Sequence, residues 1–185
     1  MAVGKTSTAR DFISRGNFNV MQMKIGRRSY PYLYDEQKSI VVTGRYDTRE
    51  CGGLDGIIKN RAIMTEYLSK IARIVSPKVI VFEAVMYGMT VKFAKEISVM
   101  LNRYGYEYIG IQLAPPLETA IDNVFRRNGG KEINLEKFCE KYDRSISASK
   151  ELKEAGYNIQ FIDTSKYQKT DLHNIIQRVI DENSR

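Results

Sequence analysis

Gly4, Lys5, Thr6 and Ser7, at the beginning of the chain, have the types and spacing of a triphosphate-binding segment. They match the second half of the phosphate-loop pattern G-x-x-x-x-G-K-[ST]. In that pattern the glycine lets the backbone approach phosphate oxygens, the lysine contacts the β and γ phosphates, and the threonine hydroxyl is a ligand of Mg²⁺. The free N–H groups of the helix that begins here also attract anions. We therefore expect these four residues to bind a nucleoside triphosphate, with Lys5 also catalytic.

Two alternatives concern this segment. Thr6 or Ser7 could simply be the N-cap of a helix. Counting back from Gly4, the first glycine of the pattern would lie two residues before Met1, and the strand that feeds the loop would lie further upstream. We therefore expect the first strand of the sheet to be missing or truncated, through a late start site or a shortened product, unless the site is a divergent one.

A carboxylate follows the most apolar segment of the chain. Residues 78–82, KVIVF, are typical of a buried parallel strand, and Glu83 comes directly after them. Functional groups in α/β sheets gather at the carboxyl ends of strands. Glu83 is therefore a candidate Mg²⁺ ligand or catalytic residue, with Tyr87 in the turn behind it as a candidate substrate contact. The alternative for Glu83 is a helix N-cap acid.

The loop over residues 44–55, GRYDTRECGGLD, is the most distinctive segment. Asp47 or Asp55 could accept a proton from an acceptor hydroxyl. Tyr46 could stack on a base, and Arg45 or Arg49 could bind a phosphate. Asp55 could instead be an ordinary acid in the first turn of the next helix.

Arg126 and Arg127 precede a Gly-Gly turn and Lys131. Arginines stabilise the charge that spreads over a transferred phosphoryl group, and a mobile lid often delivers them. We expect a lid around 126–150, to which Arg144 adds a further cation, with Arg126 also binding the nucleotide. The alternative is a solvated helix end with cations near its terminus. His173 is expected to have a surface or cap role.

These candidate residues require an alternation of helices and strands, which is typical of an α/β fold with a mostly parallel sheet. The pattern predicts a loop at 26–38, because of Pro31, and another at 44–53. The predicted helices are 5–15, 54–75, 89–103, 117–127, 134–155 and 169–183, and the predicted strands are 18–25, 39–43, 78–82, 106–112 and 158–162.

Composition limits the classes of protein to which the chain could belong. The 185 residues fit one domain, and the net charge of +7 suits anionic ligands such as nucleotides or DNA without requiring them. Cys51 and Cys139 show no metal-binding spacing and are expected to be reduced thiols. No apolar run reaches the ~20 residues that span a bilayer, and no signal peptide follows Met1, so we expect a cytoplasmic protein with no membrane partner.

These features together resemble a family. The Gly4-Lys5-Thr6-Ser7 segment, the 44–55 loop, the strand ending in Phe82-Glu83 with Tyr87-Gly88 behind it, and the basic segment 126–131 are similar to those of the bacteriophage P-loop kinases. That group includes the hydroxymethyluracil DNA kinases. The resemblance extends over essentially the whole chain, and the 44–55 loop is its most specific part.

The resemblance implies a nucleotide-kinase-like P-loop fold with three α/β/α layers in a single domain over 1–185. It also implies ATP and Mg²⁺ as cofactors. The acceptor would be the hydroxymethyl group of a modified pyrimidine in DNA, flipped out of the duplex to reach the site. Two other functions are open: a kinase of free nucleosides or nucleotides, and an inactive relative that binds nucleic acid.

Overall fold

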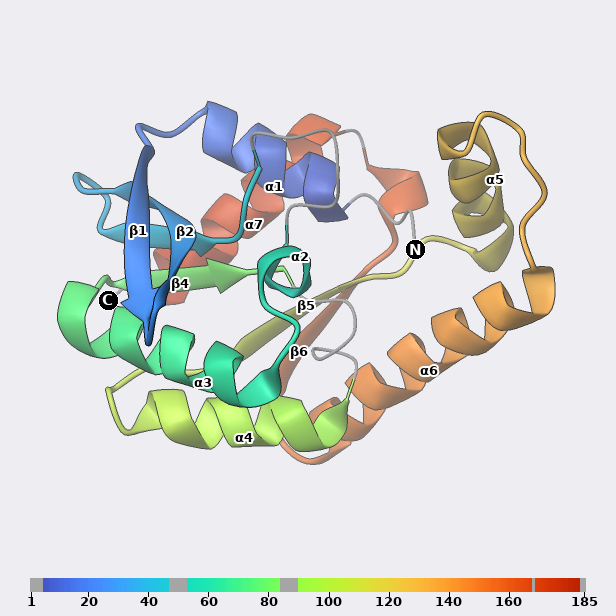
Figure 1. Ribbon diagram of the computed structural model, residues 1–185. Helices are drawn as coiled ribbons and strands as arrows, with labels where there is room; N and C mark the ends of the chain where they lie inside the picture. The colour runs from blue at the N-terminus through green and yellow to red at the C-terminus, as the bar shows by residue number, and fades with distance from the viewer. Residues whose placement is uncertain (1–4, 47–52, 84–89, 168, 184–185) are drawn as a thin grey trace.

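The computed structural model describes residues 5–46, 53–83, 90–167 and 169–183. Helices and strands alternate along most of this length (Figure 1). The helices are α1 (Lys5–Ser14), α2 (Leu54–Ile57), α3 (Arg61–Lys70), α4 (Val91–Asn102), α5 (Leu117–Arg127), α6 (Leu135–Glu154) and α7 (Lys169–Asn183), and the strands are β1 (Asn19–Ile25), β2 (Arg28–Asp35), β3 (Ile40–Thr43), β4 (Val79–Phe82), β5 (Ile109–Leu113) and β6 (Asn158–Ile162). The alternation predicted from the sequence is confirmed, and the fold is mixed α/β.

Two sets of strands form the sheet structure. The first is a four-stranded sheet in the order β1-β2-β3-β4, and the second pairs β5 with β6. The β1–β2 and β2–β3 pairings are antiparallel, whereas β3–β4 and β5–β6 are parallel. The prediction of a mostly parallel sheet is therefore wrong, since among the described strands antiparallel pairings are as many as parallel ones.

The antiparallel part arises from a hairpin that the sequence prediction missed. Residues 26–38 were expected to form a loop because of Pro31, yet Arg28–Asp35 is a strand. Gly26, with φ of 57°, is the first of the two residues that turn the chain, a position that favours glycine. Pairing with β3 begins only at Tyr32, so at Pro31 the strand β2 has a neighbour on one side. Proline is tolerated at such edge positions.

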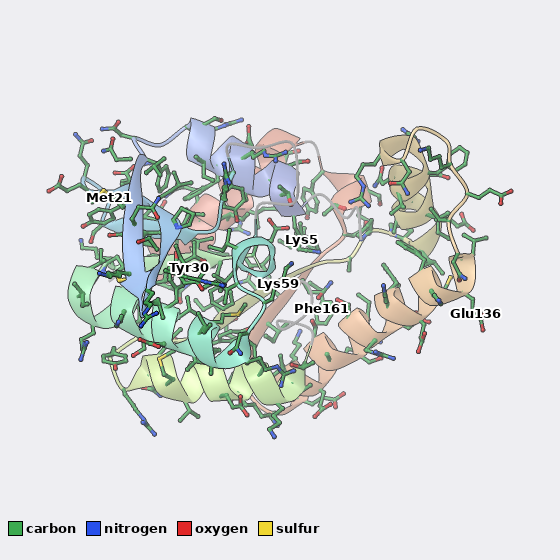
Figure 2. The ribbon with its side chains drawn as sticks, viewed as in Figure 1. Lys5, Met21, Tyr30, Lys59, Glu136 and Phe161 are labelled. Carbon is green, nitrogen blue, oxygen red and sulfur yellow. The ribbon has the colours of Figure 1, made fainter. Side chains whose placement is uncertain are left out.

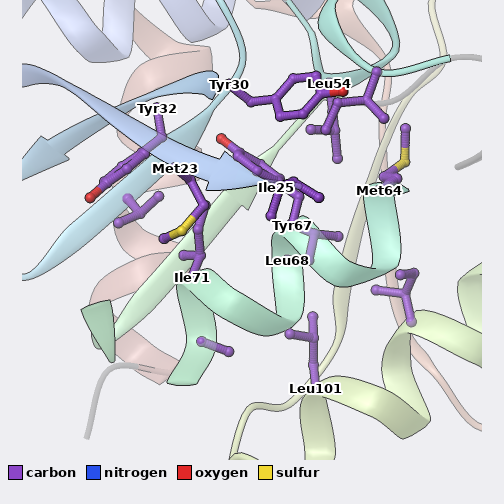
Figure 3. Packing of buried hydrophobic residues seen from close by; sticks show 14 of the residues in the cluster. Met23, Ile25, Tyr30, Tyr32, Leu54, Met64, Tyr67, Leu68, Ile71 and Leu101 are labelled. Atoms are coloured by element: carbon purple, nitrogen blue, oxygen red, sulfur yellow. The ribbon is translucent and has the colours of Figure 1, made fainter. Parts of the chain in front are cut away.

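Helices cover both faces of the four-stranded sheet. Because side chains alternate along a strand, Val41 points into one core and its neighbours Ile40 and Val42 into another. The Val41 core lies under α3 and α4 and includes Tyr67 and Leu68 (Figure 3). The other core lies under α1 and α7, which pack together (Figure 1). This arrangement agrees with the expected three layers.

The expected single helix over 54–75 is broken. α2 ends at Ile57, Ile58 is extended with φ of −127°, and α3 begins after Asn60. The Asn60 side-chain oxygen accepts a hydrogen bond from the Ile63 N–H at 3.2 Å, which makes it the N-cap of α3. A π-helical turn, Ile71–Val75, follows α3. The short α2 lies at the end of the loop that carries several candidate residues.

Two further findings concern the pairing of the strands and the length and apolar character of the helices. Among the described strands, β4 and β5 each have one paired neighbour. None of the helices described is both long enough and apolar enough to traverse a lipid bilayer.

Candidate functional site

The first turn of α1 faces the carboxyl end of β4. The Thr6 hydroxyl donates to the Glu83 carboxylate, with its oxygen 2.8 Å from Oε1 and 3.0 Å from Oε2. Glu83, directly after β4, is buried. The two residues are far apart in the sequence, and the fold brings them together because α1 begins where β4 ends. The structure therefore joins two of the residues that the sequence identified as candidates for one metal site.

Lys5 belongs to the same region. It lies at the start of α1 (Figure 2) and lines a cavity of about 700 Å³ with Tyr46 and Glu83. The cavity extends along β4 and β5. Ser7, by contrast, is exposed on α1. Lys5, Thr6 and Glu83 thus form a cluster with one cation, one hydroxyl and one carboxylate at a strand end, which we call the Lys5 cluster.

Gly53 fixes the position of Glu83 from the other side. The Leu54 N–H donates to the Glu83 backbone oxygen at 2.8 Å. A Cβ added to Gly53 would lie 2.6 Å from that same oxygen, so no larger residue fits without movement of the backbone. Sequence reasoning gave Gly53 no role. The Gly-Gly pair in the sequence indicates that the backbone passes close to another part of the chain, but the pair does not indicate that this part is Glu83.

A second hollow adjoins the cluster. Arg45 and Tyr46 line a groove of about 740 Å³ together with Gly44, Gly56 and residues of the β1–β2 hairpin, among them Tyr30 and Tyr32. Tyr46 is half-buried and lines both this groove and the Lys5 cavity, whereas Arg45 is exposed. The two hollows therefore meet at Tyr46. We call the second one the Arg45 groove.

The cavity also has polar residues on β5 and α6 that sequence reasoning missed. The Gln112 side-chain oxygen accepts hydrogen bonds from Ser149 at 2.8 Å and from Ser145 at 3.3 Å. All three residues line the Lys5 cavity. No sequence motif marks them, because the strand and the helix that carry them are joined only by packing.

The structure places the two lid arginines at the end of α5, with exposed side chains. In the described ranges, neither one lines the Lys5 cavity or the Arg45 groove. Gly129 and Gly130 have φ of 67° and 78°, and the Gly130 N–H donates to the Phe125 oxygen at 3.0 Å. The glycines therefore terminate the helix, a common role at this position. Arg144 forms a 2.9 Å ion pair with Glu140 on the surface of α6.

Several candidate residues lie outside the described part of the chain: Gly4, Asp47, Arg49 and Tyr87. Asp55 belongs to α2, and its side chain is likewise outside the described part. His173 is mostly buried between α7 and α1, with Nδ1 4.0 Å from Asp11 Oδ2. Burial is the main reason that its pKa is lowered from the ordinary 6.5. It lines neither hollow, and its burial against α1 differs from the surface or cap role expected for it.

The Lys5 cluster offers oxygen atoms of the kind that a magnesium ion takes as ligands. Mg²⁺ takes oxygen ligands and is usually held by one or two carboxylates together with phosphates and waters. The Thr6 hydroxyl and the Glu83 carboxylate are such oxygens, already adjacent. Across the described ranges no three or more His, Cys, Asp or Glu side chains form a group that could hold a metal by themselves.

The fold and this cluster define an α/β protein whose polar residues gather at the carboxyl end of the strand β4, the usual ligand site in such folds. A sequence model described as 5-hmdU DNA kinase matches residues 34–170, well over half of the chain. The chain therefore belongs to the 5-hmdU DNA kinase family, a family of phosphotransferases, and the resemblance found in the sequence is confirmed. The matched region includes Arg45 and Glu83 but begins after Lys5 and Thr6. No curated protein and no solved structure matched the chain.

Proposed function

We propose that this chain is an ATP-dependent P-loop kinase that phosphorylates the hydroxymethyl group of 5-hydroxymethyluracil in DNA. The observation that carries the proposal is the contact between Thr6 and Glu83 beside Lys5, in a chain of the 5-hmdU DNA kinase family. A helix start with a lysine and a hydroxyl, facing a carboxylate at a strand end, is the arrangement that phosphate-loop enzymes use for a nucleotide.

In this proposal the Lys5 cluster is the nucleotide side of the site. The N–H groups at the start of α1, with Gly4 before them and Ser7 behind, bind the phosphates, and Lys5 places its charge on the β and γ phosphates. Thr6 and Glu83 hold Mg²⁺. When bound, this ion would neutralise charge that develops on the phosphate oxygens during transfer.

The Arg45 groove is the acceptor side. Tyr46 lies between the groove and the Lys5 cavity, so a base held in the groove would approach the nucleotide next to this ring. The groove combines a cation, Arg45, with the half-buried aromatic ring of Tyr46, which suits a flipped base and its phosphate. Asp55 and Tyr87 complete the acceptor contacts in this proposal.

The reaction transfers one phosphoryl group. The hydroxymethyl oxygen attacks the γ-phosphorus, the bond from that phosphorus to the β–γ bridging oxygen breaks, and ADP leaves. The hydroxyl proton passes to a carboxylate, which we assign to Asp47. Arg126 and Arg127 would stabilise the charge on the transferred group, which requires the α5–α6 turn to close over the nucleotide.

The test is transfer from γ-labelled ATP to duplex DNA that contains hydroxymethyluracil, compared with the same duplex containing thymine and with free nucleosides. We expect label only in the hydroxymethyluracil DNA. Lys5→Ala should abolish most of the transfer, because the β and γ phosphates lose their cation. Lys150→Ala on α6 is the matched control, since this exposed lysine lines neither hollow.

Three outcomes would contradict the proposal in different ways. Labelling of free nucleosides in place of DNA would identify a small-molecule kinase. No transfer to any acceptor, with DNA binding retained, would identify an inactive relative. Equal activity of the Lys5→Ala and Lys150→Ala variants would place the nucleotide elsewhere.

A further inference from the structure

The outer half of the β1–β2 hairpin, residues 22–31, packs on the protein with one face only. Met23 and Ile25 point into the core under α3. Side chains alternate along a strand, so Gln22 and Lys24 belong to the opposite face, where both are exposed. We call residues 22–31 the outer hairpin.

The exposed face of the outer hairpin continues into the Arg45 groove. β3 ends at Thr43, opposite Tyr32, so the chain that follows β3 runs beside the outer hairpin. Ser29 and Pro31 of the outer hairpin line the groove together with Arg45. A DNA strand with one base in the groove would therefore pass along the hairpin.

Positive charge is concentrated in this part of the chain. Residues 19–34 contain Lys24, Arg27 and Arg28 and no Asp or Glu, so they contribute +3 of the net charge of +7. All three side chains are exposed. Within the part of the chain that the structure describes, none of them forms an ion pair. Their charge therefore faces solvent without compensation.

Asp35 and Glu66, the carboxylates that flank the hairpin on β2 and α3, have partners of their own. Asp35 is buried and accepts hydrogen bonds from two backbone N–H groups, each at 3.1 Å. Glu66 forms a 3.1 Å ion pair with Lys70 on α3. The outer hairpin is therefore a basic surface beside the acceptor groove.

The helix α3 fixes the position of the outer hairpin. The Tyr67 hydroxyl donates to the Pro31 backbone oxygen at 2.8 Å, and the Lys70 ammonium donates to the Lys24 backbone oxygen at 3.3 Å. A surface that is ordered before binding loses less conformational freedom when a partner associates. The cations of the outer hairpin thus lie on a fixed support.

The hairpin extends beyond the groove by the length of a few nucleotides. Strand residues rise about 3.3 Å each, so Arg28 lies roughly 10 Å from Pro31 along β2. The phosphates of one DNA strand follow one another at about 3.4 Å along the helix axis. The arginines at the turn would therefore meet phosphates roughly three nucleotides from a base held in the groove.

We propose that the outer hairpin binds the phosphate backbone of duplex DNA beside the target base, through Lys24, Arg27 and Arg28. The proposal rests on the proposed function, because it takes the occupant of the Arg45 groove to be a base in DNA. A duplex suits this surface, since a two-stranded β-ribbon fits the major groove of DNA. Phosphate contacts also fix the position of the duplex while another part of the site holds the base.

The test measures binding of a duplex of about 30 base pairs with one hydroxymethyluracil, at several salt concentrations and without ATP. The alanine variant is Arg27→Ala, Arg28→Ala. Its control, Lys150→Ala, Lys153→Ala, removes the same charge from exposed residues of α6 that line neither hollow. A third variant, Arg27→Lys, Arg28→Lys, keeps the charge of the hairpin.

We expect the alanine variant to bind the duplex about tenfold or more weakly than the wild type. The slope of log affinity against log salt should become shallower by about 2, because each phosphate contact contributes roughly 0.9. The lysine variant and the α6 control should both stay close to the wild type in affinity and slope. All variants should melt like the wild type, since the substituted side chains are exposed.

A second experiment locates the contacts on the DNA. Uncharged methylphosphonate linkages replace the phosphates roughly two to four nucleotides from the hydroxymethyluracil, on either side of it. They should weaken binding by the wild type about tenfold and change binding by the alanine variant little, because that variant has already lost the contacts. Equal weakening of both proteins would place the contacts on another surface and overturn the proposal.

The remaining outcomes separate this proposal from the proposed function. If the wild type binds no duplex, the DNA acceptor is wrong and the hairpin proposal fails with it. If the wild type binds and the alanine variant matches it in affinity and slope, the hairpin proposal alone is overturned. Unchanged DNA affinity with new dimers in the alanine variant would also overturn it, because the cations would then only keep the open edge of β1 from pairing. The expected loss of DNA binding in a chain that transfers no phosphoryl group would support the hairpin proposal and contradict the kinase.

Discussion

Replacement of Gly53 by alanine tests whether the loop after β3 positions the Lys5 cluster. Gly53 has φ of −60° and ψ of 172°, a conformation that alanine adopts freely, so the change introduces no backbone strain. The new Cβ would instead lie 2.6 Å from the Glu83 backbone oxygen and 3.2 Å from both its carbonyl carbon and its Cβ. These are backbone and near-backbone atoms, which no side-chain rotation can move away.

The size of the effect follows from these distances. Ordinary contact for a Cβ begins near 3.4 Å, so Gly53 and Glu83 must separate by several tenths of an ångström. Overpacking of this kind costs about 1–3 kcal/mol, which lowers the melting temperature of a chain of this length by roughly 2–12 °C. The separation of Gly53 from Glu83 also lengthens the hydrogen bond from the Leu54 N–H to the Glu83 backbone oxygen. It moves the Glu83 carboxylate that Thr6 contacts as well. Misplacement of a reacting group by about 1 Å can reduce the rate about 100-fold.

The assay compares kcat and melting temperature for Gly53→Ala with those for Gly156→Ala. Gly156, which ends α6, has φ of 88° and nothing within 4 Å of an added Cβ, so alanine there costs about 1 kcal/mol through backbone conformation alone. We expect both variants to lose stability and only Gly53→Ala to lose kcat. If Gly53→Ala retains wild-type kcat and melting temperature, or if kcat falls equally in both variants, the role given to Gly53 is wrong.

Three further predictions concern the cluster, the α5 arginines and the α1–α7 core. Thr6→Val removes the hydroxyl that faces Glu83 at nearly constant volume, so we expect a tenfold or larger fall in kcat and a higher Mg²⁺ requirement, measured by titration; an unchanged Mg²⁺ profile would remove Thr6 from the metal site. The Arg126→Ala, Arg127→Ala double variant should lower kcat at least tenfold with little change in melting temperature or ATP affinity, because both side chains are exposed; a change in ATP affinity alone would make them ground-state phosphate ligands. The pKa of His173 is lowered chiefly by burial; the charge of Arg15 lowers it further, and that of Asp11 opposes the shift. The unfolded chain therefore binds this proton more tightly than the folded chain. The free energy of unfolding should accordingly decrease as pH falls below 6.5. His173→Gln should flatten that part of the pH profile of the melting temperature, and an identical profile in the variant would contradict the assignment.

The elements that could be predicted from the sequence are those whose signals are local. The apolar run KVIVF predicts β4 at Val79–Phe82, and the end of the run places Glu83 at a strand terminus. The amphipathic stretch 117–127 predicts α5 with the same bounds. In both cases a few consecutive residues are enough to predict the element, and packing with the rest of the molecule does not change its type.

The features that could not be predicted depend on partners distant in the sequence. Pro31 is compatible with a strand because β3 stops short of it, and its carbonyl accepts a hydrogen bond from the Tyr67 hydroxyl at 2.8 Å. Gly53 is required by its contact with Glu83, which comes 30 positions later. The sequence identified Thr6 and Glu83 as separate candidates, and only the packing of α1 against the end of β4 shows that they touch.

The mixed pairing of the four-stranded sheet also has a consequence for the chain as it leaves the ribosome. β1, β2 and β3 pair in sequence, so this part of the sheet can close once Thr43 has emerged, and hairpins form in about 1–10 μs. β3 then waits for β4, whose pairing begins with Ile40 against Val79. At ribosomal rates of about 5–20 residues per second, this wait lasts roughly 2–8 s. During that interval the nascent protein presents an open apolar strand edge, Ile40–Thr43, which is the segment that a chaperone would need to shield.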